Sequence, residues 1–185
     1  DDLGIIKYDK KSSNYKFQKS SDERYFITTE LGLEDITNIK TLEFSDKSLN
    51  VKKDVTDVFN LIEGKDHITG QIYRLYNAAF ARFPDKDGLD YWISTNRSGI
   101  DSYRNIANSF ILSEEFKSLY GTDTSNEQYL SKLYENILGR SPDSSGFNYW
   151  LNQINSGLEN RSELLMGFSE STENKNIFTN ETNFF

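Results

Sequence analysis

An internal repeat constrains this chain more than any other feature of its sequence. When the sequence is shifted by 58 residues, 71–120 aligns without a gap on 129–178, and 14 of the 50 aligned positions are identical. The strongest match is one motif, R-x-P-D-x-x-G-x-x-Y-W, which contains both prolines and both tryptophans of the chain. The motif residues are Arg82, Pro84, Asp85, Gly88, Tyr91 and Trp92 in the first copy and Arg140, Pro142, Asp143, Gly146, Tyr149 and Trp150 in the second. The repeat predicts two similar helical units that pack pseudo-symmetrically around one aromatic core.

The residue types in this motif predict a break between two helices. Proline is excluded from helix interiors and disfavours helical geometry at the residue before it, so we expect Arg82 and Arg140 to lie at the end of one helix. The aspartate after each proline is suited to cap the next helix or to lie in its first turn. We expect the two motif glycines to allow close approach of a neighbouring backbone, and the Tyr-Trp pair one turn later to pack inward.

The distribution of apolar residues divides the chain into two parts. Residues 1–53 are rich in short strand patterns, whereas residues 54–185 show the spacing of helices. In the first part, alternation predicts a hairpin between 4–8 and 15–17, and further strands at 25–29 and within 42–51. The expected fold class is α+β, with a small N-terminal antiparallel β region followed by a mostly α-helical domain.

The helical part is predicted to contain the two repeats, at about 68–121 and about 124–178. Thr124 with Glu127, and Asn160 with Glu163, have the spacing of capping boxes at helix starts. The Asn- and Thr-rich tail beyond Asn174 is predicted to fray.

The first copy of the motif also presents three aspartates that could bind calcium. Asp85, Asp87 and Asp90 stand at D-x-D-G-x-D spacing, and hard cations prefer such clusters of oxygen ligands. The order is not that of an EF-hand, and the second copy keeps only one carboxylate, Asp143. A structural role for the motif and a calcium site are the two alternatives, and no other cofactor is predicted.

Composition excludes several classes of function. The chain has 29 acidic and 21 basic residues and a net charge of −8, so no broad phosphate-binding surface and no nucleic-acid partner are expected. It has no cysteine, which excludes disulfides and thiolate sites, and its single histidine, His67, excludes chemistry that needs two imidazoles. No apolar run approaches the length of a membrane span. No catalytic residue and no small-molecule substrate is predicted, although a paired-carboxylate hydrolase stays open as an alternative.

The repeat resembles the bacterial domain-of-unknown-function family 4214 (DUF4214) over about residues 68–178. The residues that carry this likeness are Tyr76, Phe80, Arg82, Pro84, Asp85, Gly88, Tyr91, Trp92, Gly99, Phe110, Ser113, Glu115 and Phe116. The second copy departs from the pattern, because Leu138 replaces Phe80 and Asn174 replaces Phe116. Residues 33–46 are similar to a β segment that often precedes this domain in secreted repeats-in-toxin (RTX), serralysin-like and S-layer-type proteins.

These likenesses imply an exported bacterial protein. The expected function is a non-catalytic structural or interaction module of an extracellular or cell-surface protein, used for attachment or assembly, with other surface or secreted protein domains or glycans as partners. The last six residues, 180–185, look like a type I secretion signal. One alternative is a glycan- or peptide-binding module that uses Tyr103 or Tyr120. Another is a phycobilisome-linker-like scaffold, since Gly139-Arg140-Ser141-Pro142 fits the G-R-x-P element of those linkers.

Overall fold

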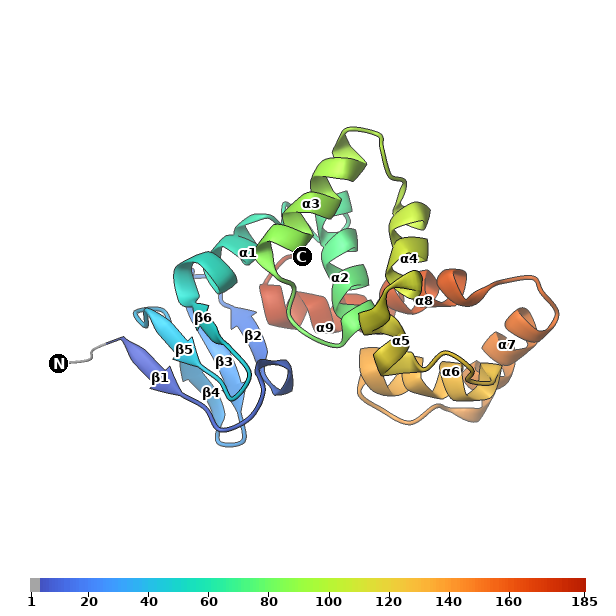
Figure 1. Cartoon of the computed structure of the whole chain (residues 1–185), viewed down its shortest axis with the longest axis horizontal. Coiled ribbons are helices and arrows are strands. Elements are labelled where there is room, and N and C mark those ends of the chain that lie inside the picture. Colours follow the sequence, from blue (N-terminus) through green and yellow to red (C-terminus); the bar gives the residue numbers. More distant parts are fainter. Residues whose placement is uncertain (1–3) are drawn as a thin grey trace.

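The computed structural model describes residues 4–185, so the first three residues of the predicted β-rich segment lie outside it. A small β region is followed by a larger helical domain, which confirms the α+β class (Figure 1). The strands form two three-stranded sheets, in the orders β1-β5-β6 and β2-β3-β4. Their bounds are β1 Ile5–Lys7, β2 Lys16–Lys19, β3 Tyr25–Thr29, β4 Gly32–Asp35, β5 Thr41–Glu43 and β6 Ser48–Asn50.

The predicted hairpin between 4–8 and 15–17 is wrong. β1 pairs with β5, whereas β2 pairs with β3 in the other sheet. The β1–β5 pair is parallel, and the other three strand pairs within 4–185 are antiparallel. The reason lies in the connecting 3-10 turn, η1 (Ser12–Asn14). The carboxylate of Asp46, in the turn between β5 and β6, accepts from the backbone N–H of Ser12 at 2.7 Å and from its hydroxyl at 3.0 Å. This long-range contact holds η1 beside the β5–β6 turn instead of letting it close a hairpin.

A short helical linker joins the sheets to the helical domain. It consists of a π-helix, η2 (Val51–Thr56), and one turn of α-helix, α1 (Asp57–Asn60). Val55, Val58 and Phe59 are fully buried, and the Phe59 ring lies 5.9 Å from that of Tyr25 and 5.3 Å from that of Phe83. The β region and the helical domain therefore share one hydrophobic core.

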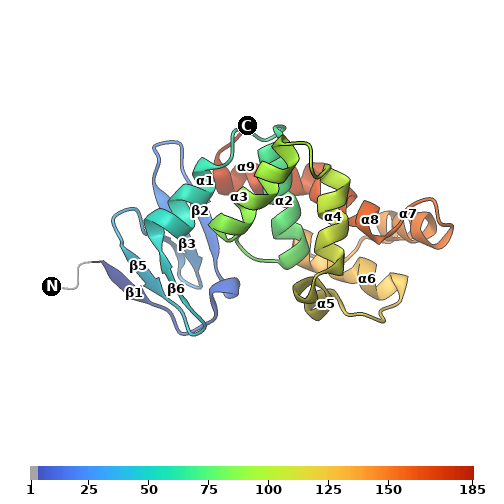
Figure 2. The same ribbon diagram turned by 45° about the horizontal axis from the view of Figure 1, so that its top comes forward.

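The helical domain consists of two copies of one four-helix unit. Figures 1 and 2 show how these helices are arranged beside the β region. The first copy contains α2 (Ile68–Phe80), α3 (Lys86–Arg97), α4 (Tyr103–Leu112) and α5 (Glu114–Tyr120). The second contains α6 (Asn126–Leu133) with its π-helical continuation η3 (Tyr134–Leu138), then α7 (Ser144–Asn155), α8 (Arg161–Ser169) and α9 (Thr172–Thr182). α8 packs on both α4 and α2, so the two copies meet along it. Within residues 4–185, no helix is long and apolar enough to cross a membrane.

Of the two predicted capping boxes, one is present and the other lies one residue later. The capping box at Asn160 and Glu163 is confirmed, because each side chain accepts from the other's backbone N–H. The box at the start of α6 lies one residue later than predicted, at Ser125 and Gln128. Thr124 is instead engaged by Arg161, whose guanidinium donates to the hydroxyl of Thr124 at 3.2 Å and also to its carbonyl.

The prediction that the tail beyond Asn174 frays is wrong. α9 extends to Thr182 and packs against β2, in the β region. Phe178 anchors it, since this side chain is only 2% exposed and its ring lies 5.6 Å from that of Tyr73. One well-placed aromatic side chain therefore outweighs the weak helix propensity of the surrounding Asn and Thr residues.

Candidate functional site

The two motif arginines make the same set of contacts in both copies. Arg82 donates through Nε and Nη2 to the carboxylate of Glu115, at 2.6 and 3.1 Å, and Arg140 donates likewise to Glu173, at 2.7 and 2.9 Å. Each guanidinium lies over the ring of the tyrosine six residues before it, at 5.5 Å and 5.1 Å. The forked pair ties the turn after one helix to the start of the fourth helix in each unit.

The motif glycines also occupy equivalent places, but their neighbour is not the predicted backbone. A Cβ atom at Gly88 would lie 3.0 Å from the hydroxyl oxygen of Tyr76, and one at Gly146 would lie 2.7 Å from that of Tyr134. A Cβ atom at either position would crowd a tyrosine hydroxyl from the preceding helix, so glycine lets that tyrosine pass close to the motif helix. The expectation of a close approach is right, and its assignment to a backbone is wrong.

The two tryptophans have matching surroundings. The ring of Trp92 lies 5.3 Å from that of Phe110, and the ring of Trp150 lies 5.6 Å from that of Phe168, which is the equivalent residue of the second copy. Both tryptophans are partly buried against the core. The pseudo-symmetric packing predicted from the repeat is therefore present at its most aromatic position.

The motif tyrosines, in contrast, do not pack inward as predicted. Tyr91 is 57% exposed and Tyr149 is 55% exposed, because consecutive helix positions point about 100° apart and the tryptophan takes the inward one. Two more equivalent residues are exposed just beyond the ends of α3 and α7, where Ile100 is 71% exposed and Leu158 is 72% exposed. Each copy therefore presents one tyrosine and one aliphatic side chain to solvent at equivalent positions.

The motif aspartates differ between the copies. Asp143 caps α7, since its carboxylate accepts from the backbone N–H of Gly146 at 2.8 Å. Asp85 makes no such bond, and its carboxylate instead lies 2.9 Å from the guanidinium of Arg82 and 3.5 Å from Nζ of Lys47. Burial disfavours the charged form of Asp85, but the nearby cations outweigh burial, so the pKa of this carboxyl lies below its usual value.

The three aspartates predicted as calcium ligands are not brought together around one point. Asp87 pairs with Lys53 at 4.0 Å and Asp90 pairs with Lys86 at 2.8 Å, whereas Asp85 has the partners just described. Asp85 and Asp87 line a cavity of about 230 Å³ between the β region and the first motif turn. Within residues 4–185, no three His, Cys, Asp or Glu side chains are grouped closely enough to hold a metal ion. Calcium binding here stays a prediction.

The tyrosines proposed for surface glycan binding are not exposed. Tyr120 is fully buried, and its hydroxyl donates to the backbone carbonyl of Ala78 at 2.9 Å. Tyr103 is half-buried, its hydroxyl lies 3.5 Å from that of Ser169, and burial raises its pKa. The interpretation of Tyr120 as a surface contact is therefore wrong, and the exposed tyrosines are Tyr91 and Tyr149.

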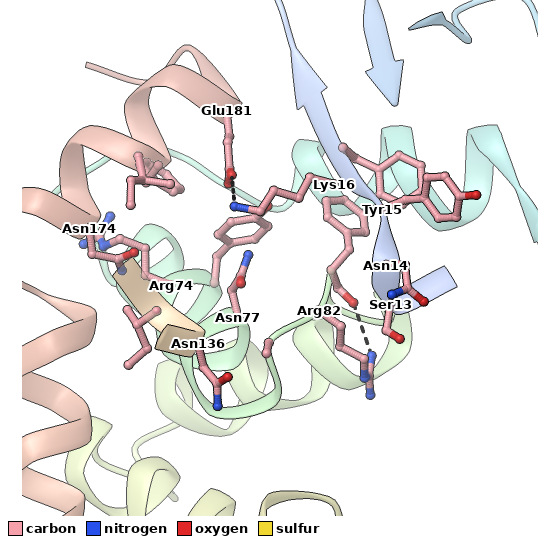
Figure 3. Close-up of a pocket in the computed structure, with 17 residues that line it drawn as sticks. Ser13, Asn14, Tyr15, Lys16, Arg74, Asn77, Arg82, Asn136, Asn174 and Glu181 are labelled. Carbon is pink, nitrogen blue, oxygen red and sulfur yellow. Dashed lines mark hydrogen bonds and ion pairs between the residues drawn. The ribbon is translucent and has the colours of Figure 1, made fainter. Parts of the chain in front are cut away.

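A second cavity lies where the β region meets both helical copies, and we call it the junction cavity (Figure 3). Its volume is about 130 Å³, and its walls come from η1 and β2, the C-terminal half of α2, η3 and α9. The sequence did not predict this cavity, because the cavity brings together segments that are far apart in the chain. The polar side chains that line it include Lys16, Arg74, Asn77, Asn136, Asn174 and Glu181.

Glu181 is the most unusual group in the junction cavity. The residue is only 9% exposed, and Nζ of Lys16 lies 3.3 Å from one of its carboxylate oxygens. Burial raises the pKa of Glu181 above its usual value, although Lys16 works in the opposite direction. Figure 3 shows Glu181 pointing from α9 towards Lys16 on β2.

Arg74 joins the two copies beside this cavity. The side chain is 1% exposed, and it donates to both carboxylate oxygens of Glu170, at 2.9 and 2.8 Å, and to the carbonyl of Lys65 at 2.8 Å. Its guanidinium also lies 4.8 Å from the ring centre of Phe178. The sequence contains one sign of this buried arginine, because Arg74 lies inside the apolar stripe of the helix 68–80.

Comparison with known proteins supports one part of the resemblance. Residues 107–178 match the family model described as "Domain of unknown function (DUF4214)". This segment begins within α4 and ends within α9, so it contains the whole second copy of the motif. No curated protein and no solved structure matches the chain. The match covers less than half of the 185 residues, and it supports the likeness to this family for residues 107–178.

Proposed function

We propose that this chain is a non-catalytic structural and interaction module of an exported bacterial surface or secreted protein, used for attachment or assembly. The observation that carries the proposal is the duplicated exposed pair, Tyr91 with Ile100 and Tyr149 with Leu158. Tyrosine is enriched at protein interfaces, and an exposed aliphatic side chain offers apolar surface that a partner can bury. Two equivalent pairs give one chain two similar contacts, and two linked contacts strengthen attachment through avidity.

The use of the motif residues supports a structural role. The arginines, glycines and tryptophans of both copies contact other residues of the same chain, where they close each four-helix unit. The single histidine also has a structural position, because His67 is the N-cap of α2 and its Nδ1 accepts from the backbone N–H of Thr69 at 3.3 Å. The likeness of residues 33–46 to the β segment of secreted proteins supports the proposed location.

Attachment is tested with the purified, fluorescently labelled chain and cell-envelope fragments from the organism that encodes it. The variant Tyr91→Ser/Tyr149→Ser is expected to lose most of the binding, and either single variant to lose less. Leu31→Ser is the matched control, because Leu31 is fully exposed on the turn between β3 and β4, far in sequence from both copies. Binding that is absent, or that is equally strong in the double variant, would contradict the proposal.

Export is tested separately by fractionating cells of the organism that encodes this chain. An antibody against the chain is expected to find it in the surface fraction or the medium. Detection in the cytoplasmic fraction alone would show that the proposed location is wrong.

A further inference from the structure

One helix of the second copy is less covered than its counterpart in the first. In the first copy, η2 and α1 pack on α3, and Leu89 and Ile93 of α3 are 0% and 1% exposed. The equivalent residues of α7, Phe147 and Leu151, are only partly buried, and the helices that pack on α7 are α6 and α8. Residues 4–185 therefore leave partly open an apolar stripe of α7 whose counterpart in the first copy is closed.

An open hollow lies beside this stripe. Its volume is about 350 Å³, and the residues that line it are Ser131, Pro142, Asp143, Ser144, Phe147 and Asn148. Two positions around it differ in size between the copies, because Ser131 stands where the first copy has Tyr73, and Ser141 stands where it has Phe83. The rings of Tyr73 and Phe83 lie 6.1 Å apart and belong to the core that the first copy shares with the β region. The second copy has serine at both places, which leaves room for a side chain from another molecule.

The helix that carries the stripe has no charge. All four charged residues of α3 have serine or asparagine as their counterpart in α7, and they are Lys86, Asp87, Asp90 and Arg97. The uncharged stretch extends over residues 144–158, although 27% of the residues in the whole chain are charged. Within residues 4–185, α7 is the only α-helix that consists of uncharged residues alone. Depletion of charge is the compositional signal that distinguishes the centre of a protein interface from the rest of a surface.

The absence of charge also indicates which partner fits. The chain has a net charge of −8, so two copies repel each other at most surfaces, and the repulsion is smallest where both facing surfaces are uncharged. Asp143, at the edge of the hollow, already has Arg140 at 3.3 Å. A charged partner would gain no ion pair from the stripe. The α7 helix of a second copy, in contrast, is itself uncharged and apolar, and a helical segment is also what covers α3 in the first copy.

Helix geometry determines which residues of α7 would meet. Successive positions are about 100° apart, so Phe147, Leu151 and Asn148 share one side of α7, whereas Tyr149 lies about 160° from Leu151. Asn148 is exposed, and an amide both donates and accepts, so the same side chain from two copies can pair across a two-fold axis. Figures 1 and 2 show α7 at the end of the helical domain away from the β region, where a second copy can approach.

We propose that two copies of this chain pair through α7 about a two-fold axis. Phe147 and Leu151 of each copy pack beside the hollow of the other, and Asn148 lies near the axis. Such an interface is isologous, because each copy contributes the same residues. It is also small, so the expected Kd of the dimer is on the order of 10–100 µM. Tyr149 stays exposed in the dimer, and the pairing therefore does not rest on the proposed attachment function.

The test is sedimentation equilibrium of the purified chain, in physiological salt, at concentrations from about 1 to 500 µM. The mass of the native chain is expected to rise with concentration from the 21.4 kDa of one chain towards twice that value. Asn148→Glu places like charges near the two-fold axis and is expected to raise the Kd at least about tenfold. Tyr149→Glu is the matched control, because it adds the same charge on the opposite side of α7, and its Kd should be unchanged.

Two further samples keep the result independent of folding. Circular dichroism checks that Asn148→Glu folds, and Ser144→Glu is the second variant, since a negative charge is favourable in the first turn of a helix. An equimolar mixture of Asn148→Glu and Asn148→Lys is expected to dimerise again, because opposite charges then face each other.

Four results would overturn the proposal. They are a native chain that stays monomeric at every concentration, equal Kd values for Asn148→Glu and Tyr149→Glu, a mixture of the two Asn148 variants that stays monomeric, and a dimer that is lost in Leu31→Ser but not in Asn148→Glu. The last result would place the interface on the β region.

Discussion

Replacing Arg74 by Met should destabilise the whole helical domain. Methionine retains most of the apolar stem but removes the guanidinium, so the carbonyl of Lys65 loses its donor and the carboxylate of Glu170 keeps only Lys175, whose Nζ lies 3.5 Å away. Removing one partner of a buried ion pair costs about 3–5 kcal/mol. The Glu170 side chain is 23% exposed and water compensates in part, so we expect a loss of about 3 kcal/mol in the free energy of unfolding.

The assay is urea unfolding followed by far-ultraviolet circular dichroism, supported by calorimetry. For a chain of this size, a loss of about 3 kcal/mol corresponds to a decrease of roughly 6–12 °C in Tm. A tryptophan fluorescence transition should coincide with the circular dichroism transition, since the shared core couples the two copies.

Arg104→Met is the matched control, because Arg104 also joins the two copies through a glutamate, Glu163. Its side chain is 56% exposed, compared with 1% for Arg74, and exposed ion pairs contribute little to stability. We therefore expect a much smaller change in Tm for Arg104→Met. Equal losses in the two variants, or a loss below about 1 kcal/mol for Arg74→Met, would refute the argument from burial.

Three further predictions concern the tail and the pH dependence of stability. Phe178→Ala should lower the free energy of unfolding by about 3–5 kcal/mol in urea, whereas Phe185→Ala, at an 84% exposed position, should change it little; equal small effects would mean that α9 is frayed. The pKa of Glu173 is lowered because Arg140 donates to its carboxylate. The stabilisation from this pair is therefore present above the unfolded pKa and is lost as pH falls through the folded pKa. Arg140→Gln should flatten the acid side of a plot of Tm against pH. Burial raises the pKa of Glu181, so the contribution of this residue is fully present below the unfolded pKa and is lost as pH rises through the folded value. Glu181→Gln should therefore gain stability relative to the native chain as pH rises above the unfolded pKa, and a difference that stays constant with pH would contradict the sign.

The helical half was predictable because its elements depend on local signals. Each helix of the first copy begins 58 residues before its counterpart, as in Lys86 and Ser144, because the same Pro-Asp turn precedes both. The matched contacts of Trp92 and Trp150 follow from the same repeat. Helix geometry could also have predicted that Tyr91 is exposed to solvent, since the next residue, Trp92, occupies the inward-facing position.

The strand pairing was less predictable because it depends on distant residues. Nothing near β1 indicates that Asp46 holds η1 and that β1 joins β5. The same applies to the tail, where burial of Phe178 beside Tyr73 stabilises a helix that local propensity disfavours. In both cases a contact across the chain outweighs the local preference.

The sequence by itself determined the α+β class, the duplicated unit and the turns that separate its helices, because periodicity and proline act within a few residues. Only the tertiary structure decided which groups share the junction cavity and how Glu181 and Arg74 are paired. Desolvation and ion pairing depend on distances between segments that are far apart in the chain, so no local pattern of residues records them.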